Sequence, residues 1–97
     1  MANQIRMSPE TMRTRAKETD NQVNNMQDLI RSMDRLLNTL KGEWEGDAMQ
    51  GYEDRFNKIK PVLKNAQELL EEIAGNLRST AKIVEETDQK IASQYRS

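Results

Sequence analysis

The chain has 97 residues, enough for one small domain, and a chain this short has difficulty burying a sufficient hydrophobic core alone. It contains no Cys and no His, which excludes disulfides, thiolate or imidazole metal sites and histidine-dependent nucleophiles. Lys and Arg number 15 against 16 Asp and Glu, so the net charge is −1 and a nucleic-acid partner is not expected. A partner subunit remains the expected source of further burial.

A first helix is predicted over residues 8–41. Ser8 can cap the free backbone N–H groups, Pro9 suits the first helical position, and Glu10 complements the helix dipole. Side chains then recur at alternating steps of four and three, a heptad pattern typical of a helix packed along its whole length. The members of this row are Met12, Ala16, Thr19, Val23, Met26, Ile30, Met33, Leu37 and Leu40.

The heptad pattern stops at residues 42–46, which are predicted to form a turn. Gly42 is placed to end the first helix in a left-handed conformation. Asp47 offers a new cap, and Gln50 three residues later completes a capping-box pattern. A second helix is therefore expected to start at residue 47.

The turn contains Trp44, the only tryptophan of the chain. On physical grounds it can simply plug the open end of a helical bundle, with Gly46 supplying a positive φ. It can equally serve as a surface docking element, because turns carry function more often than bundle cores do. The sequence leaves both interpretations open.

The second helix is predicted over residues 47–92, with residues 93–97 as a C-terminal tail. The same alternation of four and three runs along it. The members of its row are Tyr52, Phe56, Ile59, Leu63, Ala66, Leu70, Ile73, Leu77, Thr80, Val84, Thr87 and Ile91. Pro61 lies inside the pattern and should remove one backbone hydrogen bond and bend the helix.

The short connection predicts an all-α fold, an antiparallel helical hairpin. Pairing Leu40 with Ala48 across the turn places Ser8 near Thr80, so everything after Thr80 is expected to overhang the first helix.

Further apolar residues widen both heptad rows beyond what a two-helix contact needs. They are Leu29 and Leu36 in the first helix and Val62 and Leu69 in the second. Two helices cannot cover both sides of a widened stripe. We therefore expect a second copy to pack against the first as a homodimer, giving an elongated four-helix bundle with helices about 20° from antiparallel.

These features together resemble the WXG-100 family, the small secreted helical hairpins of type VII secretion systems. The resemblance rests on the chain length, the two heptad-patterned helices, the Ser8-Pro9-Glu10 start, and Trp44 and Gly46 as the Trp-Xaa-Gly triplet of a central turn. A lone triplet is a weak signal, but the combination is specific and covers almost the whole chain.

A second family signature lies near the C-terminus. Type VII substrates carry a helical pattern in which an apolar residue is followed by an acidic residue and two further apolar ones, and Val84, Asp88, Ile91 and Tyr95 occupy these places. This spacing puts all four on one helix face. The mycobacterial form needs an acidic residue four places after its Tyr, and only two residues follow Tyr95. The resemblance therefore favours the bacillary, homodimeric branch.

The resemblance implies a non-enzymatic secretion substrate or component. It implies export as a folded dimer, cytoplasmic before export and then secreted without a cleaved signal peptide. The implied partners are a second copy, possibly another WXG-100 protein, and a membrane-bound FtsK/SpoIIIE-type ATPase that recognises the C-terminal pattern, with the Trp44–Gly46 turn as a second contact. No cofactor, metal or small-molecule substrate is expected.

Other interpretations of the same residues remain open. Val84 and Ile91 can simply continue the core row, and the chain can be an intracellular helical adaptor or a chaperone-like partner for a larger secreted toxin. The paired carboxylates Glu71-Glu72 and Glu85-Glu86 lie among Lys and Arg, where nothing apolar would raise a carboxyl pKa, so catalysis is not expected.

Overall fold

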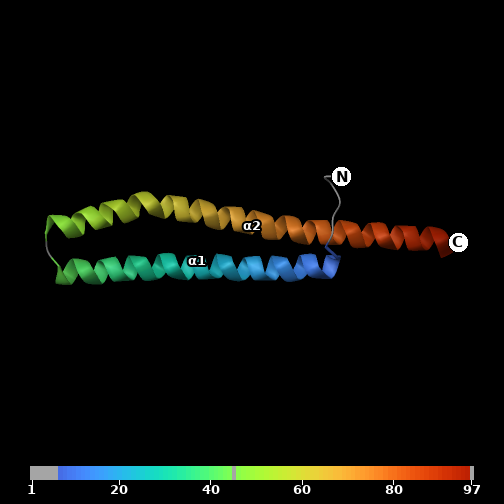
Figure 1. Cartoon of the computed structure of the whole chain (residues 1–97), viewed down its shortest axis with the longest axis horizontal. Helices are drawn as coiled ribbons and strands as arrows, with labels where there is room; N and C mark the ends of the chain where they lie inside the picture. The colour runs from blue at the N-terminus through green and yellow to red at the C-terminus, as the bar shows by residue number, and fades with distance from the viewer. Residues whose placement is uncertain (1–6, 45, 97) are drawn as a thin grey trace.

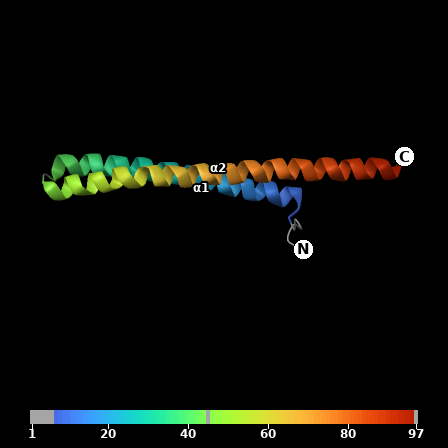
Figure 2. The ribbon, with the colours of Figure 1, turned by 90° about the horizontal axis from the view of Figure 1, so that it is seen from above.

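A computed structural model describes residues 7–44 and 46–96, which form two long antiparallel helices joined by a tight turn (Figure 1). Helix α1 spans Pro9–Glu43 and helix α2 spans Asp47–Arg96. The hairpin is a rod of 77 × 24 × 14 Å, and the view from above shows the helices crossing at a shallow angle (Figure 2). The predicted all-α hairpin is confirmed.

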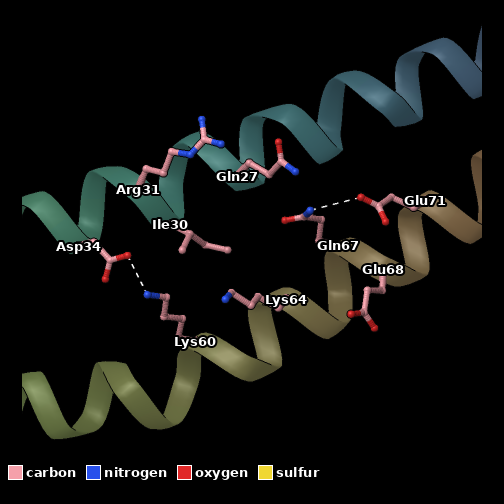
Figure 3. Close-up of a pocket in the computed structure, with 9 residues that line it drawn as sticks. All are labelled: Gln27, Ile30, Arg31, Asp34, Lys60, Lys64, Gln67, Glu68 and Glu71. Carbon is pink, nitrogen blue, oxygen red and sulfur yellow. Dashed lines mark hydrogen bonds and ion pairs between the residues drawn. The ribbon is translucent and has the colours of Figure 1, made fainter.

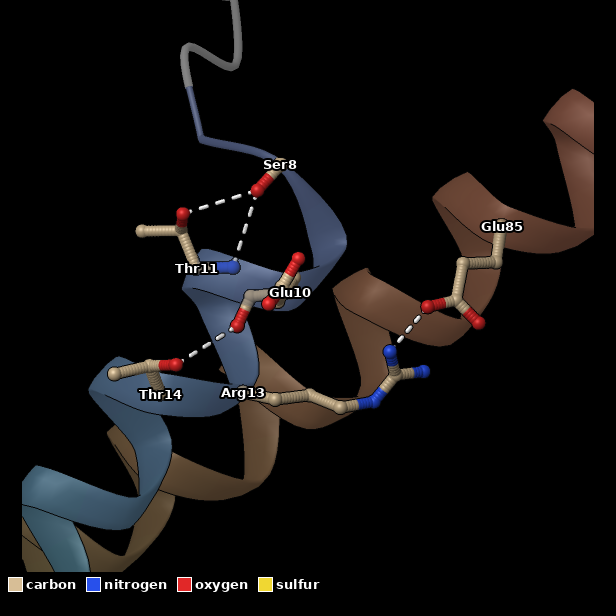
Figure 4. A network of polar contacts seen from close by, with 6 residues as sticks. All are labelled: Ser8, Glu10, Thr11, Arg13, Thr14 and Glu85. Carbon is tan, nitrogen blue, oxygen red and sulfur yellow. Dashed lines mark hydrogen bonds and ion pairs between the residues drawn. The ribbon is translucent and has the colours of Figure 1, made fainter.

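The start of α1 has the predicted cap. The Ser8 hydroxyl oxygen accepts a hydrogen bond from the Thr11 backbone N–H at 3.1 Å, and Pro9 is the first helical residue (Figure 4). The Thr14 hydroxyl donates to the Glu10 carbonyl at 3.1 Å in the next turn. Because Pro9 has no N–H to donate, α1 has a defined beginning at this residue.

The turn differs from the prediction in how the helices end and start. Helix α1 continues through Gly42 to Glu43, two residues beyond the predicted end, and the Trp44 N–H donates to the Leu40 carbonyl at 2.7 Å. Gly46, with φ of 137°, is the only residue with positive φ in the described ranges, so the reversal takes place there. Gly42 was therefore wrongly predicted to end the helix.

The second helix begins at the predicted residue, but with a different cap. The Gly46 carbonyl accepts the first bond of the helix, from the Gln50 N–H at 3.4 Å, so Gly46 takes the capping position. Asp47 is then the first helical residue, where its charge complements the helix dipole.

The packing row predicted for α1 is correct. Met12, Ala16, Val23 and Ile30 are buried, and the remaining members of the row are partly buried. Few other positions of α1 could have formed the contact with α2, because the residues on either side of this row are mostly charged or polar.

Half of the packing row predicted for α2 is correct: Phe56, Leu63, Leu70, Leu77 and Val84 are buried or partly buried. The alternate members of the observed row lie one position beyond the predicted ones. Its members are all buried or partly buried: Met49, Glu53, Phe56, Lys60, Leu63, Gln67, Leu70, Ala74, Leu77, Ala81 and Val84. The predicted members Tyr52, Ile59 and Ile73 are instead 50%, 48% and 42% exposed. The small side chains of Ala74 and Ala81 are 1% and 0% exposed at the contact with α1, while the larger apolar side chains lie beside it.

Helix α2 follows a longer path than α1. Lys41 pairs with Glu53 near the turn and Arg13 pairs with Glu85 at the far end, so 32 residues of α2 run beside 28 of α1. Figure 1 shows α2 arching away from α1 around residue 60 on the colour bar. Pro61 lies inside α2, and a proline without an N–H bends a helix at such a point.

The overhang of α2 is shorter than predicted, and its end is helical. Ala81 is fully buried and Glu85 still contacts α1, so the uncovered part begins after Glu85 and not after Thr80. The prediction was wrong because the turn places Lys41 opposite Glu53, a wider register than the one assumed. Helix α2 continues to Arg96, so the predicted tail from residue 93 is helical as far as the structure describes it.

Candidate interaction surfaces

One long side of the hairpin, here called the charged edge, carries four ion pairs between the helices. They are Arg13–Glu85, Asp20–Arg78, Asp34–Lys60 at 2.8 Å and Lys41–Glu53 at 2.9 Å. The four members from α1 lie at heptad spacing, with Gln27 completing the series. The charged edge therefore pairs its charges within the hairpin, and none of these pairs was predicted from the sequence.

The pair at the open end of the hairpin also shifts the titration of its members. The hydrogen bond from Arg13 lowers the pKa of the Glu85 carboxyl, against a smaller opposing effect of desolvation, and raises that of Arg13 itself. Because the folded-state pKa of Glu85 is depressed, the pair stabilises the fold above the unfolded-state pKa of this carboxyl. The contribution is lost as pH falls through the lowered value.

A polar cavity of about 400 Å³ opens in the middle of the charged edge, beside the Asp34–Lys60 pair (Figure 3). Its lining residues are Gln27, Ile30, Arg31, Asp34, Lys60, Lys64, Gln67, Glu68 and Glu71. Cations and carboxylates are mixed around it, and the Gln67 amide donates to Glu71 at 3.3 Å. The balanced lining gives no preference for a ligand of either sign.

The opposite side, here called the apolar edge, exposes large hydrophobic side chains from both helices. Its members are Leu29 and Leu36 of α1 and Tyr52, Ile59, Val62, Leu69, Ile73 and Ile83 of α2, which are 42–63% exposed. An apolar groove of about 390 Å³ runs between the helices here, lined by Met33, Leu36, Leu37, Tyr52, Arg55, Phe56 and Ile59. Contiguous exposed apolar surface of this kind marks an interaction site.

The turn presents an exposed aromatic pair. Trp44 is 44% exposed, and its ring lies 5.9 Å from that of Tyr52, at an interplanar angle of 50°. A shallow pocket of about 320 Å³ lies beside it and includes Gly46 and Met49. Within the hairpin, Trp44 packs on the surface of α2 and leaves almost half of its side chain available to a partner.

The four residues of the predicted C-terminal pattern continue the packing row of α2 past the end of α1. Val84 is partly buried, whereas Asp88 is exposed, Ile91 is 46% exposed and Tyr95 is 88% exposed. They lie at the end of the rod opposite the turn (Figure 1). One hairpin therefore separates Trp44 and Gly46 from the C-terminal pattern by most of its length.

The structure adds Ile83 to the exposed apolar residues near this end. Its signal in the sequence was a third row at heptad spacing, formed by Val62, Leu69 and Ile83 with Asn76 between the last two. The first two had been predicted only to widen the packing row locally.

The described residues meet neither the requirements of a metal site of three or more ligands nor those of a membrane-spanning helix. No group of three or more Asp and Glu side chains there is close enough to hold a metal ion. Neither helix has, within those ranges, a stretch long and apolar enough to cross a membrane.

Comparison with known proteins gives similarity over almost the whole chain. Residues 4–89 match the family model WXG100, described as proteins of 100 residues with WXG. The chain is 32% identical to protein YukE of Bacillus subtilis over 99% of both chains. It is 30% identical to type VII secretion system extracellular protein A of Staphylococcus aureus over 94% of both.

Two solved structures are similar over almost the whole chain as well. EsxA of Geobacillus thermodenitrificans superposes with a TM-score of 0.88 at 33% identity, covering 94% of this chain and 100% of that one. The secreted protein EsxB of Bacillus anthracis gives a TM-score of 0.79 at 26% identity, covering 91% and 99%.

Proposed function

This chain belongs to the WXG100 family, and from that premise we propose that it is a non-enzymatic substrate and component of a type VII secretion system. Its similarity to a type VII extracellular protein over 94% of both chains supports this proposal. The structural observation that carries it is the end of α2. There Asp88, Ile91 and Tyr95 extend the packing row beyond the start of α1, and no described residue of α1 covers them.

We propose that the exported form is a homodimer closed over the apolar edge. The ion pairs of the charged edge are satisfied within one hairpin, so this side gains little from a second copy. The apolar edge instead leaves eight large side chains in water, and their burial favours association. Two hairpins joined there form the elongated four-helix bundle.

A two-fold axis explains how the two ends of the rod can act together. The apolar edge of α2 runs from Tyr52 to Ile83, and an antiparallel partner whose axis crosses its middle brings its own turn beside the last turns of this α2. Trp44 of one subunit and the C-terminal pattern of the other then lie at the same end of the dimer. This arrangement supports the proposal that the turn is a second contact.

The proposed recipient is the membrane-bound FtsK/SpoIIIE-type ATPase of the secretion system, which would read the face of Val84, Asp88, Ile91 and Tyr95. Apolar anchors on one helix face, combined with one acidic group, suit recognition in a groove. The chain would therefore be cytoplasmic before export and extracellular afterwards.

Asp88→Ala tests this proposal with little risk to the fold. Asp88 is exposed and has no ion pair in the described part of the chain, so the free energy of unfolding is expected to change by less than about 0.5 kcal/mol. Loss of a charge-assisted contact in a partner groove costs about 2 kcal/mol or more, roughly thirtyfold in affinity. Quantitative immunoblotting of culture supernatant and cells should show export falling accordingly.

A truncation after Thr87 provides the stronger form of the same test. It removes the uncovered turns and retains Val84 and Glu85, which contact α1, so the hairpin should keep its helicity and its dimer. Lys82→Ala is the matched control, because this exposed residue lies off the row. Undiminished secretion of both Asp88→Ala and the truncated chain would refute the C-terminal address. Absence of the unmodified chain from the culture supernatant would instead favour an intracellular adaptor.

Trp44→Ala is expected to affect export more than stability. The side chain is 44% exposed and loses mainly its contact with Tyr52, so unfolding should become easier by about 1 kcal/mol. Trp44→Phe keeps an aromatic ring and should restore much of that loss. Thermal unfolding by circular dichroism, measured beside secretion, separates the two effects: secretion that only follows stability contradicts a contact at the turn.

A further inference from the structure

We propose that the partner protein binds the end of α2 through one of its own helices, which lies in line with α1 and antiparallel to α2. This helix takes over the packing row at the point where α1 stops. The inference rests on the proposed function and specifies the shape and chemistry of the partner. It follows from the way the two helices of the hairpin end at different places.

The first argument is the continuity of the packing row of α2. Ala81 is 0% exposed and Val84 partly buried, while Ile91 and Tyr95, at the same spacing of four and three, reach 46% and 88%. The side chains needed for helix packing therefore continue for about 15 Å, at 1.5 Å per residue, beyond the last contact with α1 at Glu85. A helix aligned with α1 meets the same kind of surface that α1 itself uses.

The second argument is that the sequence prevents α1 from extending further toward the N-terminus. Ser8 accepts the Thr11 N–H and Pro9 occupies the first helical position (Figure 4). A longer helix would place Pro9 in its interior, where the missing N–H and the clash of its ring with an earlier carbonyl are destabilising. A helix-start signal therefore determines that α1 itself does not extend beside Asp88 and Ile91.

The third argument gives the charge of the partner helix. Asp88 lies in the same heptad series of α2 as Glu53, at the opposite end of the row. Glu53 pairs with Lys41 of α1 at 2.9 Å, whereas Asp88 has no ion pair in the described residues. By the same geometry, a helix in line with α1 would offer Asp88 a Lys or Arg, with apolar residues facing Ile91 and Tyr95.

The second copy in the dimer is not the proposed occupant of this row. It is assigned to the apolar edge, which includes Ile59 and Leu69 and lies to one side of the packing row. The two surfaces meet near Ile83 and Val84 but face different directions on α2. The dimer thus leaves the end of the row available for the partner helix.

The test is to extend α1 toward the N-terminus, so that it covers the exposed end of the α2 packing row. The test variant combines Ser8→Ala and Pro9→Ala, which remove the stop, with Ala2→Leu and Ile5→Leu, which continue the α1 heptad toward the N-terminus. Arg6 lies one heptad before Arg13 and can face Asp88 in this extension. The control variant has the same Ser8 and Pro9 changes but Ala2→Gln and Ile5→Gln.

Hydrogen exchange in the full-length dimer reports whether the row is covered, and titration with the purified FtsK/SpoIIIE-type ATPase reports recognition. We expect slower exchange over residues 86–95 and at least about tenfold weaker ATPase binding in the test variant, with the control variant binding like the unmodified chain.

Two outcomes would overturn the inference: exchange that is not slowed, because the row then does not accept a helix in line with α1, or slowed exchange with unchanged ATPase binding. Failure of the proposed function looks different, because the truncation after Thr87 would then leave both secretion and ATPase binding unaffected. If the truncation abolishes binding and the covered row does not weaken it, only the partner helix is refuted.

Discussion

Leu69→Arg is expected to separate the dimer into single hairpins. Leu69 is 57% exposed on the apolar edge, so the single hairpin tolerates a charged side chain there. In the proposed dimer this position would be buried, and near the two-fold axis the two introduced cations would also face each other. An unpaired buried charge costs at least about 3 kcal/mol, more than a hundredfold in the dimer dissociation constant.

Sedimentation equilibrium of the variant over micromolar concentrations measures this effect directly. Asn65→Arg is the matched control, because it adds the same charge to α2 at an exposed polar position that belongs neither to the packing row nor to the apolar edge. Circular dichroism should show both variants to be helical at low temperature. If the unmodified chain sediments as a monomer, or if Leu69→Arg dimerises as tightly as Asn65→Arg does, the apolar edge is not the dimer interface.

Phe56→Ala is expected to give the largest loss of stability within the hairpin itself. Phe56 is 6% exposed on the packing row, and the Lys60 ammonium lies 5.8 Å from the centre of its ring. Removing a buried phenylalanine leaves a cavity and costs about 3–4 kcal/mol, and the lost cation–π contact adds about 0.5–1 kcal/mol. A domain with 5–15 kcal/mol of total stability loses much of its margin.

Urea unfolding at one fixed protein concentration measures this loss, because dimerisation makes the apparent stability depend on concentration. Phe56→Leu keeps most of the volume and should cost less than half as much, while Ile59→Ala on the neighbouring, half-exposed row tests whether position matters. A loss at Phe56 no larger than at Ile59 would contradict the packing row described for α2.

The difference between the two helices shows what periodicity can and cannot determine. In α1 one row of apolar residues stands between polar neighbours, and Met12, Val23 and Ile30 are buried as predicted. In α2 three adjacent rows are apolar, and periodicity alone cannot say which of them faces α1. The choice depends on close approach at Ala74 and Ala81, which are too small to mark a core in a sequence pattern.

The candidate interaction residues were predictable from spacing, but their surroundings were not. The steps between Val84, Asp88, Ile91 and Tyr95 require a common face on any helix. How much of that face is covered depends on where α1 begins and on the register across the turn, which Lys41 and Glu53 fix in three dimensions. The pairing of Asp34 with Lys60 likewise depends on the path of α2 around its bend.

The long, nearly one-dimensional contact between α1 and α2 also makes the hairpin a rigid spacer. The turn and the free end of α2 lie at opposite ends of a rod 77 Å long, and helical rise fixes their separation at about 10 Å per heptad. The length of the helices therefore determines the distance between the turn and the free end of α2. Adding or deleting matched blocks of seven residues in both helices would change the span and keep the two faces aligned.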